Sequence, residues 1–155
     1  MINIKEYKIK LDDKSEKFYE NISKFLDKPV EKVLENTKGI QKQVNEIFKG
    51  NVQIVNNYDW TKDVTFLGFL RDIGKYINVN YMLNKDIIAR RLETGITYAE
   101  FSYTLLQGYD FLHLFEHENC VLQAAGSDQW GNITTGIELI KKKTGKEAYG
   151  FTMPL

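Results

Sequence analysis

The sequence predicts an α/β fold with a parallel sheet, preceded by a mainly helical part. A long segment with helical periodicity, Thr97–Glu118, leads into a short apolar run, Val121–Ala125. A polar turn, a second helical segment and another extended run, Tyr149–Leu155, follow. Helix, strand, helix, strand in this order is the repeating unit of a parallel sheet. Before Thr97 the chain has mostly helical patterns.

The N-terminal elements are expected as a strand over Ile2–Leu11 and a helix from Ser15 to Leu26. A second helix starts at Pro29, which the first turn of a helix accepts, and ends at Gly50. The apolar run Val52–Val55 predicts a short strand. Asn56–Trp60 is expected to form a polar turn after it.

Three helices are expected next. Asp63 is expected to cap an amphipathic helix that ends at about Tyr76. Asn84 is expected to cap a helix over Lys85–Glu93, and Gly95 to close it. Thr97 opens the longest helix, and Asn119 stops it. After the strand and its turn, a helix from Thr134 to about Lys143 is expected to end at Gly145.

The composition describes an ordinary globular chain of 155 residues with room for one domain. Its 21 basic and 21 acidic residues balance, so no global field attracts nucleic acid. The single cysteine, Cys120, cannot form an internal disulfide. The sequence shows no membrane span and no secretion signal. We therefore expect a cytoplasmic protein without a membrane partner.

The polar stretch Gly126–Thr134 lies at the carboxyl end of the predicted strand, where open α/β sheets bind ligands. Gly126 lets backbone approach a ligand closely. The Asp128 carboxylate offers acceptors for ribose hydroxyls, and the Gln129 amide offers both a donor and an acceptor. The stretch fits equally well an ordinary strand-to-helix loop in which Ser127 or Asp128 caps the helix.

Tyr103, Gln107 and Asp110 follow an i, i+4, i+7 spacing, which places them on one face of a helix. A pocket for an aromatic amino acid needs this mixture of ring contacts and hydrogen-bonding groups. By spacing alone, a Tyr103 packed in the core beside a solvated Gln107 and Asp110 fits better. His113 and His117, one turn apart, fit a structural pair better than a metal site, because no third ligand accompanies them.

The chain resembles the tyrosyl-tRNA synthetases, members of the class I aminoacyl-tRNA synthetases, over about residues 29–155. The resemblance rests on five motifs in the right order: Asn56–Trp60, Phe69–Lys75, Glu93–Ile96, Glu100–Asp110 and Gly126–Thr134. It implies a partial Rossmann-type (doubly wound, parallel-sheet) catalytic domain with a mainly helical insertion. The implied division is an unassigned segment 1–28, an insertion and dimerisation region 29–96, and the second half of the tyrosyl-adenylate-binding domain 97–155.

The resemblance also implies roles for single residues. Tyr103 and Gln107 would bind the ammonium group of tyrosine, Asp110 its phenol, and Gln129 would lie near its carboxylate. Three further residues would face the adenylate: Asp128 at the ribose, Gly126 through its backbone, and Gln123 at the base of the pocket. Ala125 departs from the family, whose members have glycine there, and its methyl group would tighten the nucleoside site.

In this family the tyrosine carboxylate attacks the α-phosphate of ATP, and the tyrosyl group then passes to tRNA. The resemblance implies ATP as a substrate, Mg²⁺ with it, tRNA as a partner in the complete enzyme, and a homodimer formed through about residues 66–95. Catalysis rests on positioning, so no catalytic residue and no bound metal is predicted here. The sequence lacks the family's His-Ile-Gly-His and Lys-Met-Ser-Lys-Ser motifs, and we expect the chain alone to be inactive.

Two other interpretations remain at this stage. The chain could be a non-catalytic module that kept the fold for dimerisation or for binding a small ligand. It could also resemble the related tryptophan enzymes, but the Gln107 and Asp110 pair and the Asp128–Trp130 turn argue against this.

Overall fold

The computed structural model describes residues 30–155, except the side chains of residues 30, 31, 33, 86, 87 and 90. The expected strand over 2–11, the expected helix over 15–26 and the unassigned segment 1–28 lie outside the described residues. The chain divides into two compact units, Met1–Asn56 and Asn57–Leu155.

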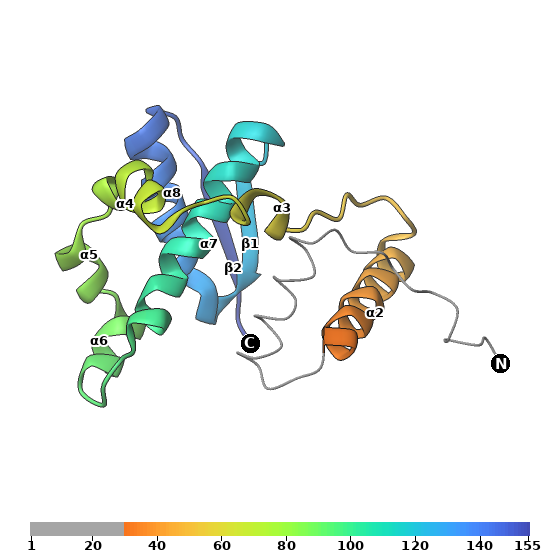
Figure 1. Ribbon diagram of the computed structural model, residues 1–155, viewed down its shortest axis with the longest axis horizontal. Coiled ribbons are helices and arrows are strands. Elements are labelled where there is room, and N and C mark those ends of the chain that lie inside the picture. Colours follow the sequence, from red (N-terminus) through yellow and green to blue (C-terminus); the bar gives the residue numbers. More distant parts are fainter. Residues whose placement is uncertain (1–29) are drawn as a thin grey trace. The chain divides into compact units, whose positions relative to one another are not determined.

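The described part of the first unit contains one long helix, α2 (Val30–Phe48) (Figure 1). It confirms the helix expected between Pro29 and Gly50, and Gly50 follows it with a positive φ of 73°. The strand expected at Val52–Val55 is wrong, since this segment lies outside the sheet. Apolar β-branched residues favour a strand, but only pairing with a neighbouring strand forms one.

Short helices open the second unit: α3 (Tyr58–Thr61), α4 (Phe66–Asp72), the 3₁₀ turn η2 (Gly74–Tyr76), α5 (Val79–Leu83) and α6 (Asp86–Leu92). The polar turn expected at Asn56–Trp60 is therefore partly helical, because Tyr58 is buried and starts α3. The cap expected at Asp63 is wrong: the Thr65 hydroxyl accepts the Gly68 amide at 3.1 Å instead.

The helix expected from Asn84 also begins differently. Asn78 caps α5 by accepting the Tyr81 amide, so Asn84 ends that helix. The N-cap position of α6 belongs to Lys85, which makes no capping bond with its side chain. No helix in residues 30–155 combines the length and the hydropathy of a membrane span.

The C-terminal part alternates helix and strand as expected, with α7 (Tyr98–His117), β1 (Leu122–Gly126), η3 (Ser127–Gln129), α8 (Trp130–Thr144) and β2 (Tyr149–Met153). Thr97 caps α7 through a reciprocal capping box with Glu100, and Asn119 ends it with a φ of 55°. Helix α8 starts four residues before the expected Thr134, and Gly145 closes it at a φ of 73°.

Strands β1 and β2 pair in parallel, with Leu122 opposite Tyr149 and Gly126 opposite Met153. Helix α8 connects the two strands and packs on one face of the pair (Figure 1). Gly150 marks this contact, because a Cβ there would lie 2.5 Å from Cγ2 of Ile133. The predicted α/β fold is therefore present as a small parallel sheet in a mostly helical unit.

The second unit is held together where α7 crosses α8. Gly108 and Gly136 meet at this crossing: a Cβ on Gly136 would lie 3.4 Å from Cα of Gly108 and 2.9 Å from Cδ1 of Phe111. Around the crossing lies a core that includes Ile73, Phe111, Leu112, Leu139 and Ile140, all nearly inaccessible to solvent. The absence of side chains at two facing positions lets the helix backbones approach closely.

We expect Gly136→Ala to lower the free energy of unfolding by about 1–2 kcal/mol, because the added methyl group overlaps the buried Phe111. Gly131→Ala in the same helix is the matched control, since its nearest neighbour would be Cδ of Lys85 at 3.9 Å. Urea unfolding followed by circular dichroism measures both. Equal stability of the two variants would contradict the close crossing.

Candidate functional site

Helix α7 carries the predicted tyrosine-binding residues, and its capping box fixes where the helix begins. Tyr103 is 59% exposed, so the interpretation that places it in the core is wrong. Gln107 and Asp110, further along the same helix, are half-buried. Both of these residues form hydrogen bonds to other elements.

A chain of hydrogen bonds joins α7 to the turn after β1. Asn132 donates to Oε1 of Gln107 at 3.1 Å and to Oε1 of Gln129 at 3.0 Å. Gln129 in turn donates to Oδ2 of Asp128 at 2.7 Å. Asn132 is buried in the first turn of α8, so it holds the two predicted ligand-binding segments against each other. The structure thereby brings Gln107, Gln129 and Asp128 together.

The turn after β1 is not a capped loop. Residues Ser127–Gln129 form the 3₁₀ turn η3, and Gln129, at the N-cap position of α8, makes no capping bond. The interpretation with Ser127 or Asp128 as N-cap is therefore wrong. A Cβ on Gly126 would lie 2.7 Å from Oδ1 of Asp128 and 2.8 Å from Cδ2 of Leu155. Only glycine lets the carboxylate of Asp128 fold back over the end of β1.

Gln123 on β1 has an unsatisfied acceptor. Its side-chain oxygen Oε1 is inaccessible to solvent and has no hydrogen-bond partner among the described residues. Buried polar atoms are nearly always paired, so this oxygen needs a donor from a ligand or from another segment.

Asp110 is held by two donors that the sequence did not reveal. Nδ2 of Asn57 lies 3.0 Å from Oδ2, and Nε1 of Trp60 lies 2.8 Å from Oδ1. Both donors belong to the Asn56–Trp60 motif. The sequence therefore singled out this segment, but it did not show that its partner is Asp110. Each carboxylate oxygen keeps a lone pair for a further donor.

The two histidines lie next to each other, and one of them stacks on Trp60. The ring of His113 lies 4.4 Å from the Trp60 ring with an angle of 11° between the planes, and 4.3 Å from the His117 ring. Burial lowers the pKa of His113, and the neighbouring His117 lowers it further. In residues 30–155, no three His, Cys, Asp or Glu side chains gather as a metal site.

Lys85, which precedes α7 in the sequence, contacts the start of α8. The spacing of residues along the sequence could not indicate this contact. Its ammonium group donates to the carbonyl of Gly131 at 2.5 Å and to the hydroxyls of Thr134 and Thr135 at 2.9 and 2.6 Å. Nζ also lies 4.9 Å from the centre of the Tyr81 ring. Burial lowers the pKa of Lys85 to about 8, although Glu138 acts against this shift.

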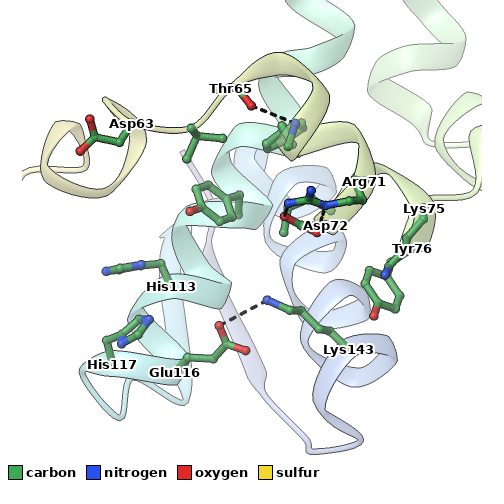
Figure 2. A pocket seen from close by; sticks show the side chains of 15 residues that line it. Asp63, Thr65, Arg71, Asp72, Lys75, Tyr76, His113, Glu116, His117 and Lys143 are labelled. Carbon is green, nitrogen blue, oxygen red and sulfur yellow. Dashed lines mark hydrogen bonds and ion pairs between the residues drawn. The ribbon is translucent and has the colours of Figure 1, made fainter.

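A cavity of about 550 Å³ lies on another side of α7 (Figure 2). It is lined from α4, η2, α7 and α8, with an ion pair between Lys143 and Glu116 at 3.5 Å and another between Arg71 and Asp72 at 2.7 Å. None of the predicted ligand-binding residues lines it. Those residues instead occupy a more open surface, as the exposure of Tyr103 and Asp128 indicates.

These features define a class of protein: an α/β protein with polar side chains at the carboxyl end of a parallel strand, which is where open α/β sheets bind ligands. Comparison with known proteins makes the class specific. A family model described as class I tRNA synthetases (W and Y) matches residues 28–155. The chain belongs to this family.

Individual relatives agree with the family. The tyrosine–tRNA ligase 2 of Streptococcus thermophilus is 53% identical over 125 residues, which cover 81% of this chain and 41% of that protein. The tyrosine–tRNA ligase of Porphyromonas gingivalis is 61% identical over 107 residues, which cover 66% of this chain and 25% of that protein. A C-terminally truncated mitochondrial tyrosyl-tRNA synthetase of Aspergillus nidulans superposes with a TM-score of 0.60 at 30% identity, covering 79% of this chain and 40% of that structure. The chain thus spans less than half of each relative.

We expect the stability of the wild type, relative to Lys85→Met, to rise between about pH 8 and pH 10.5. The pKa of Lys85 falls from its ordinary 10.5 to about 8 on folding, so in this window the unfolded chain keeps a proton that the folded chain has released. Below pH 8 Lys85 is charged in both the folded and the unfolded chain, so the folded state bears the full cost of burying the charge. Chemical denaturation at several pH values measures the difference, and parallel pH profiles for the two proteins would contradict it.

Proposed function

We propose that this chain supplies the part of a tyrosine–tRNA ligase that recognises tyrosine and its adenylate. The observation that carries the proposal is the hydrogen-bond chain from Gln107 through Asn132 to Gln129 and Asp128. It ties a helix face suited to an amino acid to a turn suited to a nucleotide. The proposal also draws on the relatives, which are named tyrosine–tRNA ligases.

Tyrosine would lie across α7. Asp110 would accept the phenol hydroxyl, since its carboxylate is already oriented by Asn57 and Trp60 and needs no reorganisation. Tyr103 and Gln107 would bind the ammonium group, and Gln129 would lie near the substrate carboxylate. A buried acceptor that phenylalanine leaves unpaired can discriminate by a factor of about 10⁴ or more.

The adenylate would occupy the turn after β1. Asp128 would accept the ribose hydroxyls, and the backbone at Gly126 would contact the nucleoside. A donor from the ligand or from another segment would satisfy the buried oxygen of Gln123. The methyl group of Ala125 would narrow this site. Residues 97–155 would then form the second half of a Rossmann-type domain.

The reaction of the complete enzyme would use tyrosine, ATP and tRNA. The tyrosine carboxylate would attack the α-phosphate of ATP, and pyrophosphate would leave. Neither this step nor the transfer of the tyrosyl group to tRNA needs a protein nucleophile. The residues of this chain would bind and orient the reactants, which is itself a large contribution to rate. Mg²⁺ would accompany ATP, as the resemblance to the family implies.

The region 29–96 would act as the helical insertion, and residues 66–95 would form a symmetric dimer contact. This part of the second unit exposes large apolar side chains: Phe66 is 64% and Leu67 76% exposed, and Leu70, Val79 and Leu92 are also exposed. Such side chains favour burial against a second copy of the chain. The same observation supports the alternative function, a non-catalytic dimerisation module.

We expect Asp110→Asn to weaken tyrosine binding by roughly ten- to a hundredfold, the size of a lost hydrogen bond to a charged group. Asp110→Ala should abolish tyrosine binding while the circular dichroism spectrum stays unchanged. Phenylalanine provides the comparison, since its weak binding should respond little to either change.

Isothermal titration calorimetry with both amino acids measures these effects. His117→Asn is the matched control, because His117 lies on the same helix and contacts His113 rather than Asp110. Unchanged tyrosine affinity in Asp110→Ala would contradict the assignment of the phenol to this carboxylate.

A further inference from the structure

A continuous line of side chains runs from the cavity to Asp110. His113 and His117 lie next to each other at the cavity, as Figure 2 shows, with ring centres 4.3 Å apart. His113 stacks on Trp60 at 4.4 Å, and Nε1 of Trp60 donates to Oδ1 of Asp110 at 2.8 Å. Two different surfaces of α7 are thereby connected through one indole ring.

The indole depends on this stack for its orientation. Helix α3, which carries Trp60, has only four residues, and Asn57 at its N-cap position makes no capping bond with its side chain. Asn57 instead donates to Asp110, the same carboxylate that Trp60 contacts. A helix this short has little stability of its own, so side-chain contacts must fix its residues. The nearly parallel rings, 11° apart, define the plane in which the indole N–H points.

We propose that His113 is a positioning residue for Asp110: its ring holds Trp60 in the plane from which the indole N–H orients the carboxylate. Since Asp110 matters because it reads the tyrosine phenol, this inference rests on the proposed function. It goes further by naming a residue that would act on substrate recognition without touching the substrate.

The arrangement also links the charge of His113 to the state of Asp110. Burial and the neighbouring His117 lower the pKa of His113, whereas Asp110 and Glu116 on α7, and Glu118 just after it, favour the charged imidazole. The other charged groups around the cavity are Asp63, Arg71, Asp72, Lys75 and Lys143. If the charge of Asp110 is removed, His113 loses an attraction and its pKa must fall further.

The histidine signals of an NMR pH titration test this link directly, because the whole sequence contains only 2 histidines. His117→Asn assigns the two signals. We expect Asp110→Asn to lower the pKa of His113, because the Asp110 charge favours the charged imidazole.

Two substitutions separate positioning from structural support. His113→Phe keeps an aromatic ring on Trp60. This variant should keep the preference for tyrosine over phenylalanine, but the preference should no longer depend on pH near the pKa of His113. His113→Ala removes the ring and should reduce that preference by roughly tenfold, the worth of one hydrogen bond to a charged group.

An unmoved His113 titration in Asp110→Asn, or an equal tyrosine preference in His113→Ala and the wild type, would overturn the positioning role. If the His113 titration responds to Asp110→Asn while Asp110→Ala keeps its tyrosine affinity, the physical link stands and the proposed reading of the phenol fails.

Discussion

The close crossing of α7 and α8 at Gly108 and Gly136 is the constraint on which the rest of the second unit depends. Without a Cβ at either position, the backbones approach until Phe111 fills the space beside them. The core around Leu112, Leu139 and Ile140 closes on this contact. Since α8 also packs on the parallel strands, one crossing sets the distance from α7 to the sheet.

This distance decides which polar groups meet. Gln107 directly precedes Gly108 on α7, and Asn132 lies one turn before Gly136 on α8. Asn132 can therefore bridge Gln107 and Gln129 with a single amide. Lys85 joins the same turn of α8 to the short helices, so the turn proposed to bind the adenylate is anchored from two directions.

The site combines satisfied and unsatisfied polar groups in a way that fits recognition. Asp110 is oriented by two donors before any ligand arrives, which reduces the reorganisation that binding requires. Gln123, by contrast, keeps a buried oxygen without a partner in the described part of the chain. Preorganised acceptors and an open acceptor are both features of a surface that is completed by another molecule or segment.

The sequence by itself determined the elements whose signals are local. Thr97 and Glu100 mark the start of α7 within four residues, and Asn119 and Gly145 mark helix ends, because caps and left-handed turns are formed by neighbouring residues. The strand–helix–strand order and its parallel pairing followed from periodicity in the same way. Local patterns failed at Val52–Val55, which pairs with neither described strand, and at Asp63, where Thr65 caps the helix instead.

Only the tertiary structure decided how the site is held. Asn57 and Trp60 reach Asp110 across 53 and 50 residues, and Lys85 reaches Gly131 across 46. The motifs contained Asn57, Trp60 and Asp110, but nothing in their spacing indicated which residues would be partners. A hydrogen bond between distant segments exists because packed helices bring its two atoms to within about 3 Å, and that distance is a property of the packing rather than of either segment.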